Sequence, residues 1–366
     1  MKVRHLEIQN FRNIRFAEIS PSENVNVIYG ENAQGKTNLL ESIWLFTGCK
    51  SFRSHRDREM VKFEESFSKN TMDFYAYGRE QTAALWIDQK RNAMKNGVNL
   101  KAPAELIGSF YAVLFVPNHL SLIKEGPQFR RRFLDTALCE IHPPYAKALA
   151  KYNRTLVQRN ALLKDIRFCP DLLDTLDVWD EHLANIGAFL LTERVLYTEK
   201  LSQKANEIYH GLSAEKETLE VTYQNNAKAY SKDTKENKEI LLALLKEHRH
   251  EDLENHITVT GPHRDDLKIT IDGLSARNYG SQGQQRSAAL SLKLAEADII
   301  EEVTGEAPVI LLDDVLSELD VKRQDYILNH IQNRQVFLTC CDPSNVLRLC
   351  GGKSFLLKNG EIQKGD

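Results

Sequence analysis

Residues 25–37 read Val-Asn-Val-Ile-Tyr-Gly-Glu-Asn-Ala-Gln-Gly-Lys-Thr, and this stretch decides the fold. Its first five residues are mostly β-branched or aromatic, which predicts a buried strand, and residues 38–46 carry apolar side chains at helical spacing. The glycines between strand and helix let the backbone curl so that successive N–H groups point at an anion. We therefore predict a phosphate loop at residues 30–37, in which Lys36 reaches the β- and γ-phosphates of a nucleotide and Thr37 holds Mg²⁺.

A second stretch, Pro-Val-Ile-Leu-Leu-Asp-Asp at residues 308–314, predicts a buried strand that ends in two carboxylates. Desolvating an unpaired charge costs several kcal/mol, and Mg²⁺ would neutralise it. We expect Asp313 to bind the metal, directly or through water, and Asp314 to lie nearer the γ-phosphate and orient the attacking water. Lys36, Asp313 and Asp314 are thus the candidate catalytic residues, and Thr37 and Asp313 are the candidate metal ligands. Structural acids that cap a loop are the alternative.

A third stretch, Gly-Ser-Gln-Gly-Gln-Gln at residues 280–285, precedes a predicted helix at residues 286–303. Serine and glycine N–H groups at a helix start form another anion site. One triphosphate does not need two such sites, so we expect this loop to contact the γ-phosphate held by a second copy of the chain in a symmetric dimer. An ordinary helix cap is the alternative.

The bulk composition is that of a soluble protein of one or two domains. The chain has 366 residues, of which 27% are charged and 42% hydrophobic. Because the formal net charge is −3, any affinity for nucleic acid must come from local patches. The six cysteines lack zinc-ligand spacing and no signal peptide opens the chain, which predicts a cytosolic protein. No run of 18 apolar residues is present, so no membrane span is expected.

Between the phosphate loop and the carboxylate strand, the chain alternates between β and helical patterns. Strands are predicted in the first 118 residues, three helices at residues 127–210, an exposed connection at 225–238, and short strands at 256–260 and 267–271. Gly-Pro-His-Arg-Asp-Asp at residues 261–266 has enough polar chemistry for a functional loop, with a hydrogen-bonded turn as the alternative. Basic residues at 50–58 and 130–132 are either solvated or contact phosphates.

Together these motifs resemble the ATP-binding-cassette (ABC) ATPases of the SMC-like branch and, more closely, the RecF family of bacterial recombination mediators. The resemblance is carried by residues 6–13, 30–38, 50–53, 131–135, 261–267, 281–286 and 311–320. It implies an α/β fold: an ABC/SMC-like ATPase head, with a mixed sheet, flanking helices and an antiparallel β layer. The head would comprise residues 1–118 and 256–366, with residues 119–255 inserted as a helical arm.

The resemblance also implies the ligands and the activity. ATP and Mg²⁺ would be the cofactors, with ATP held by Gly30, Asn32, Gly35, Lys36, Thr37 and Asn38 of one copy and Ser281, Gly283 and Gln284 of another. The family consists of cytoplasmic, DNA-dependent ATPases that dimerise on ATP. They bind single-strand/double-strand DNA junctions and gapped duplexes and, with RecO and RecR, help to load RecA. Arg53, Arg56 and Arg131 are the candidate DNA contacts.

The sequence leaves two alternative functions. A transporter's nucleotide-binding subunit is disfavoured by the helical insertion, and a nuclease-linked ATPase of the same branch needs a further acidic metal-binding domain. Three departures from the cassette pattern bear on the rate of ATP hydrolysis. Cys340 stands where a switch histidine is expected, Asn118 stands where a glutamine is expected, and Asp314 replaces the catalytic glutamate. A misplaced general base slows the reaction it catalyses. We therefore expect slow ATP hydrolysis, which would set how long the protein stays on DNA.

Overall fold

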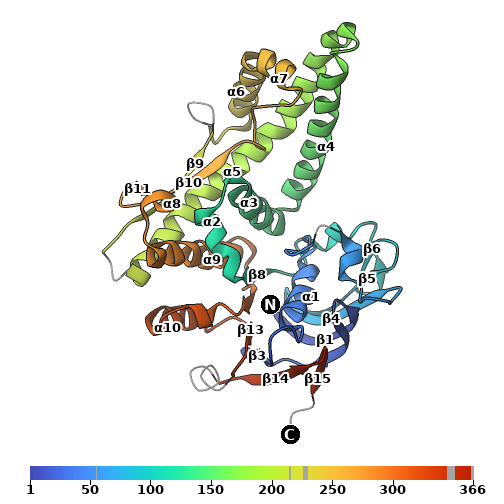
Figure 1. The fold of residues 1–366 in the computed structure, drawn as a ribbon, viewed down its shortest axis with the longest axis vertical. Helices are drawn as coiled ribbons and strands as arrows, with labels where there is room; N and C mark the ends of the chain where they lie inside the picture. The colour runs from blue at the N-terminus through green and yellow to red at the C-terminus, as the bar shows by residue number, and fades with distance from the viewer. Residues whose placement is uncertain (55, 214–215, 226–229, 344–350, 364–366) are drawn as a thin grey trace. The chain divides into compact units, whose positions relative to one another are not determined.

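The computed structural model describes residues 1–54, 56–213, 216–225, 230–343 and 351–363 (Figure 1). The chain forms two compact units: Met1–His119 with Lys293–Asp366 (unit 1), and Leu120–Leu292 (unit 2). Unit 2 begins next to the expected boundary at residue 119, but it continues to Leu292 instead of ending at residue 255. Residues 256–292 therefore pack with the helical segment, because β10 (Asp266–Ile271) pairs with β9 (Leu219–Gln224) of that unit.

Unit 1 is built on a twelve-stranded mixed sheet. One part is antiparallel, with β1 paired to both β2 and β4, and the other is parallel, with β3 between β14 and β13. All residues of β12 are buried, as expected for a strand in the parallel part of a covered sheet. The strands in sheet order are β7 (Val98–Asn99), β6 (Arg91–Lys95), β5 (Arg79–Ile87), β4 (Ser68–Ala76), β1 (Lys2–Phe11), β2 (Ile14–Ile19), β15 (Glu361–Gln363), β14 (Lys353–Lys358), β3 (Val25–Tyr29), β13 (Val336–Cys340), β12 (Val309–Asp313) and β8 (Ala112–Phe115).

The helices of unit 1 are α1 (Lys36–Trp44), α10 (Val321–His330) and the part of α9 (Gln282–Thr304) that follows residue 292. Helix α1 packs against β1, β12 and β13. Its apolar residues Leu39, Leu40 and Ile43 are fully buried. This packing holds the start of α1 at the carboxyl ends of β3 and β12, where the phosphate loop lies.

Unit 2 is organised around the long helix α5 (Leu176–Ser213), which contacts α4, α6 and β9. Prolines begin α3 (Pro127–Ile141) and α4 (Pro143–Asp165), and Pro170 follows α4, so the three predicted helices are confirmed. The remaining elements are α2 (Ser121–Lys124), α6 (Thr234–Glu247), α7 (Arg249–Asn255), α8 (Ala276–Tyr279) and the three-stranded sheet of β11 (Leu274–Ser275), β10 and β9.

Two local predictions in unit 2 are wrong. An exposed connection is predicted at residues 225–238, of which 226–229 lie outside the described residues. Its last part is helical instead, because Asp233 accepts hydrogen bonds from two backbone N–H groups and starts α6 at Thr234. Residues 256–260 do not form a strand. There, the N–H groups of Thr258 and Val259 donate to the side chains of Asn160 and Asp252, each at 2.8 Å, instead of to a neighbouring strand.

Candidate nucleotide-binding site

The phosphate loop joins β3 to α1 through backbone conformations that favour glycine. Gly30 has φ 150° and Gly35 has φ 110°. A Cβ on Gly30 would lie 2.3 Å from the carbonyl oxygen of Leu357, and a Cβ on Gly35 would lie 2.5 Å from Asn13 Oδ1. No side chain caps the first turn of α1, so its N–H groups can bind an anion such as a phosphate.

Lys36 is buried beneath this loop. Its Nζ donates to the carbonyl oxygens of Gly30 at 2.7 Å and Glu31 at 3.2 Å, and it lies 3.6 Å from Cys341 Sγ. Cys341 in turn donates to Asn32 Oδ1 at 3.3 Å. The lysine ammonium is therefore held at the loop by backbone oxygens.

Thr37, Asp313 and Thr339 meet at the carboxyl ends of β12 and β13. The hydroxyls of Thr37 and Thr339 each donate to Asp313 Oδ1 at 2.8 Å. Asp313 is 7% exposed, and in the described part of the chain no cation pairs with it. A buried carboxylate beside a hydroxyl is a donor set that suits Mg²⁺, so Thr37 and Asp313 fit the predicted metal ligands.

Asp314 follows at the end of the strand with a left-handed backbone, φ 51°. Its N–H donates to Thr339 Oγ1 at 3.0 Å, so Thr339 links the two acidic residues. Cys340, in the position expected for a switch histidine, is half-buried. Burial and, second, the nearby Asp314 raise the pKa of its thiol to about 11, so it stays protonated at neutral pH. The side chain of Asn118 lies outside the described residues.

Two residues that the sequence did not mark as functional support the loop and the helix that follows it. Asn13 donates to the carbonyl oxygen of Ala33 at 3.0 Å and accepts from Asn38 Nδ2 at 2.7 Å, so it joins the loop to the first turn of α1. Arg12 donates to both carboxylate oxygens of the fully buried Glu41 in α1. Both lie in the stretch 6–13 that carries the family resemblance. That resemblance is the sequence feature that could have marked them as functional.

The second predicted anion site forms the start of α9 in unit 2. Ser281 Oγ accepts from the N–H of Gln284 at 3.2 Å, and Gln284 Oε1 accepts from the N–H of Ser281 at 2.7 Å. This reciprocal pair is a capping box, so α9 begins at Gln282, earlier than predicted. Gln284 also donates to Glu217 at 2.7 Å. Ser281 and Gln284 thus act as the helix cap within one chain, and Gly283 lies in the first turn.

The three candidate DNA contacts lie in different settings. Arg56 is exposed at the start of a short 3₁₀ turn. Arg53 is 46% exposed and donates to Asn38 Oδ1, next to the phosphate loop. Arg131 donates to the backbone oxygen of Asp265 at 2.8 Å, and its neighbour Arg130 forms a two-bond ion pair with Asp266. In unit 2 the arginine run therefore holds the 261–266 loop in place.

The 261–266 loop is a hydrogen-bonded turn inside unit 2. His263 contacts the Tyr152 hydroxyl and the backbone oxygen of Thr258, each at 2.9 Å. Asp265 accepts from the Tyr223 hydroxyl at 2.9 Å. Burial lowers the pKa of His263 to about 4 and raises that of Asp265 to about 7.

Comparisons with known proteins agree with this geometry. Residues 1–272 match the AAA ATPase domain family. The DNA replication and repair protein RecF of Acetivibrio thermocellus is 39% identical over 93% of this chain and 94% of that protein. Its counterpart in Lachnoclostridium phytofermentans is 39% identical over 100% of both chains.

Solved structures extend the match to the fold. The recombination mediator protein RecF, solved as RecF-ATPrS in the RecFOR pathway, has a TM-score of 0.93 at 38% identity and covers 100% of this chain and 98% of its own. An Smc head domain from Pyrococcus furiosus has a TM-score of 0.55 at 16% identity, covering 99% and 95%, and shares the fold alone. The predicted ABC/SMC-like fold class is confirmed.

No helix among the described residues combines the length and the apolar character that a membrane span requires. The phosphate loop and the Asp-Asp strand end agree with the full-length similarity to RecF proteins at 38–39% identity. The chain therefore belongs to the RecF family of DNA replication and repair proteins.

Proposed function

We propose that this chain is an ATP-driven DNA-binding protein of recombinational repair and replication restart in the bacterial cytoplasm. Two copies pair when each binds ATP and Mg²⁺, and the pair binds single-strand/double-strand junctions at gaps. With RecO and RecR it then helps to load RecA. Met1–His119 and Lys293–Asp366 are assigned to the ATPase head, and Leu120–Leu292 to the arm.

One observation carries the ATP-binding part of this proposal: Lys36, Thr37 and Asp313 meet at one end of the parallel strands. The loop backbone and Lys36 would bind the phosphates, and Thr37 and Asp313 would hold Mg²⁺, which would offset the negative charge of the phosphates. Asp314 orients the attacking water. Because its side chain is one methylene shorter than glutamate, hydrolysis is slow and DNA release is timed by it.

The pairing of two copies rests on the second anion site. The N–H groups at the start of α9 already have Ser281 and Gln284 as caps. Gly283, which has no side chain, lets a phosphate approach this turn closely. In the proposed dimer, the γ-phosphate bound by one copy therefore contacts the α9 start of the other.

Sedimentation velocity of the protein with ATP, with ADP and without nucleotide tests the dimer, and a gapped duplex added to each tests DNA binding. The ATP sample should sediment as a dimer and bind the duplex, with affinity that falls steeply as salt rises. Lys36→Met should abolish both effects because the phosphates lose their cation. A Lys36→Met protein that still pairs at saturating ATP would contradict the assignment of the phosphate loop.

Two substitutions at one position separate capping from pairing. Ser281→Ala removes only the cap, costs about 1 kcal/mol of stability, and should still dimerise. Ser281→Arg places a bulky cation at the turn and should block dimerisation while the monomer still binds ATP. Equal loss of ATP binding in the Ser281→Arg monomer would show that the loop acts within one chain. A steady-state turnover above about one per second would exclude the timer role, since typical kinases reach 1–100 per second.

A further inference from the structure

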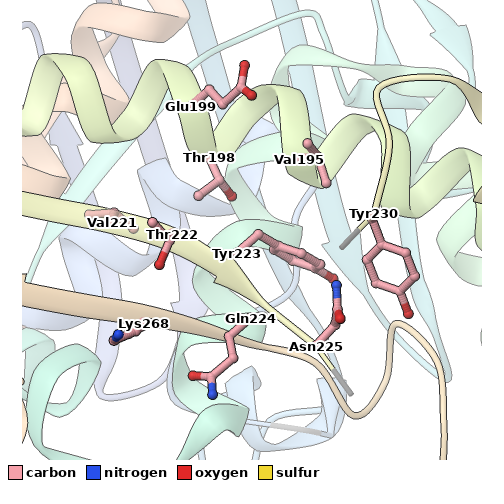
Figure 2. A pocket seen from close by; sticks show the side chains of 10 residues that line it. All are labelled: Val195, Thr198, Glu199, Val221, Thr222, Tyr223, Gln224, Asn225, Tyr230 and Lys268. Carbon is pink, nitrogen blue, oxygen red and sulfur yellow. The ribbon is translucent and has the colours of Figure 1, made fainter. Parts of the chain in front are cut away.

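Unit 2 contains a cavity of about 440 Å³ beside strand β9 (Figure 2). Helix α5 contributes Thr198 and Glu199 to its lining, β9 contributes Tyr223, and β10 contributes Lys268. Asn225 and Tyr230 complete this side. Its volume is within the usual range for a small-molecule site.

The cavity lies at the end of β9, where side chains of α5 no longer accept hydrogen bonds from the edge of the strand. β9 is the outer strand of its sheet. The N–H groups of Leu219 and Val221 point away from β10 and donate to Asn206 and Ser202 of α5, at 3.0 and 2.9 Å. Because hydrogen-bonding direction alternates along a strand, the N–H of Tyr223 points to the same edge.

At Tyr223 the pattern of helix-to-strand hydrogen bonds stops. Thr198, one turn before Ser202 on α5, donates its hydroxyl to the backbone oxygen of Arg194 at 2.7 Å. Within the described ranges, no α5 side chain accepts from the Tyr223 N–H. The cavity therefore presents a backbone donor, and native proteins seldom leave such a group unpaired.

Two further polar atoms face the same region without a partner. Asn225 Oδ1 and the Tyr230 hydroxyl are buried and make no hydrogen bond in the described structure. Figure 2 shows the Asn225 amide beside Tyr223, with Tyr230 next to them. Leaving a buried polar atom unpaired costs about 1–3 kcal/mol. Each atom has less than 1 Å² accessible, so a rotation of its side chain toward a bound ligand would recover that free energy.

These features together select one class of ligand. The backbone N–H of Tyr223 in β9 and the side-chain amide of Asn225, just after the strand ends, offer a donor and an acceptor to a nucleobase edge. The rings of Tyr223 and Tyr230, with centroids 6.2 Å apart, supply apolar faces for stacking. The exposed ammonium of Lys268 supplies a cation for a phosphate.

We propose that this cavity binds one nucleotide, with its base against Tyr223, the side chains of Asn225 and Tyr230 turning to pair with it, and its phosphate near Lys268. Two sources share this chemistry: a free mononucleotide, or an unpaired nucleotide of single-stranded DNA. The second source alone rests on the proposed DNA-binding function. The cavity belongs to unit 2, whereas the ATP-binding residues Lys36 and Asp313 belong to unit 1.

Equilibrium binding to the full chain carrying Lys36→Met tests the proposal, because this substitution silences the phosphate loop. The probes are dAMP, followed by calorimetry, and a fluorescent (dA)8 oligonucleotide, followed by anisotropy. Saturable binding of dAMP alone assigns a free mononucleotide, and binding of both probes assigns single-stranded DNA. No saturation of either probe at millimolar concentration would overturn the proposal and leave the ATP-dependent function untouched.

Variants locate the binding. Asn225→Ala and Tyr230→Phe should each weaken binding about tenfold, the equivalent of one lost hydrogen bond. Tyr279→Phe is the matched control, since this tyrosine of unit 2 is 72% exposed and outside the cavity. Lys268→Ala should weaken dAMP but not deoxyadenosine. Binding by both Asn225→Ala and Tyr230→Phe equal to that of Tyr279→Phe would refute the site.

A second measurement needs no substitution at the cavity. Irradiation of the protein with a 5-iodouracil-containing single strand should cross-link Tyr223 or Tyr230, identified by peptide mass spectrometry. A cross-link only at other residues would contradict the proposal for single-stranded DNA, even if Asn225→Ala failed to fold.

Discussion

The stability of unit 2 should carry two opposed pH dependences, from Asp265 and His263. Asp265 is 3% exposed, and burial raises the pKa of its carboxyl from 3.8 to about 7. The folded state therefore holds this proton more tightly than the unfolded state. Its contribution to stability is complete below about pH 4 and is lost as pH rises to about 7. At about 1.4 kcal/mol per pH unit, the loss is about 4 kcal/mol.

His263 acts in the opposite direction. Burial lowers the pKa of its imidazole from 6.5 to about 4, because the folded site favours the neutral ring between Tyr152 and Thr258. Its contribution is complete above about pH 6.5 and is lost as pH falls to about 4, a change of about 3 kcal/mol. Between these limits the two contributions nearly cancel in the wild-type protein.

Single substitutions should expose each contribution. In Asp265→Asn the amide oxygen can still accept from the Tyr223 hydroxyl, but the titration is gone. The free energy of unfolding of this variant, relative to wild type, should rise by about 1.4 kcal/mol per pH unit from pH 4 to 7. For His263→Asn the same difference should fall with a similar slope from pH 4 to 6.5. The two variants are controls for each other because their slopes have opposite signs.

Urea unfolding at a series of pH values measures these differences. Of the three tryptophans, Trp179 lies in α5 of unit 2, whereas Trp44 and Trp86 lie in unit 1. A background with Trp44→Phe and Trp86→Phe makes fluorescence report on unit 2 alone. If the curve for Asp265→Asn runs parallel to that of the background protein, the carboxyl is not desolvated and the reasoning fails.

Three further predictions concern unit 1. Asn13→Ala removes one hydrogen bond to the phosphate loop and one to the first turn of α1, worth about 0.5–1.5 kcal/mol each. ATP affinity should therefore fall about 5- to 150-fold in calorimetry, and an unchanged affinity would contradict its supporting role. Arg12→Met removes the two-bond ion pair of the buried Glu41, which keeps the Ser51 hydroxyl and the Arg53 guanidinium at 3.9 Å. It should cost about 3 kcal/mol in urea unfolding, the low end for a broken buried pair, with partial recovery on adding Glu41→Gln. Gly35→Ala, at φ 110° and against Asn13, should lose ATP binding in the same titration, and retained affinity would refute the close approach.

The phosphate loop and the buried strand before Asp313 could be predicted because their signals are local. Buried parallel strands need continuous apolar runs, and the loop needs glycines where φ is positive. Both requirements are written in consecutive residues, and the structure holds Lys36 at the loop and joins Thr37 to Asp313. The strand predicted at 256–260 is wrong because its backbone N–H groups donate to the side chains of Asn160 and Asp252 instead of to a strand. Asn160 is distant along the chain and Asp252 lies in helix α7, so the residues of the segment itself do not reveal these partners.

By itself, the sequence determined the α/β class, the phosphate loop and its candidate metal ligands, since strand, turn and helix signals depend on neighbours in the chain. Only the tertiary structure decided that Asn13 braces the loop, that Arg12 pairs with Glu41 of α1 and that Arg131 holds the 261–266 turn. It also decided that a cavity opens at the edge of β9. These features depend on side chains that meet across more than one element, and no local pattern records which partners will meet.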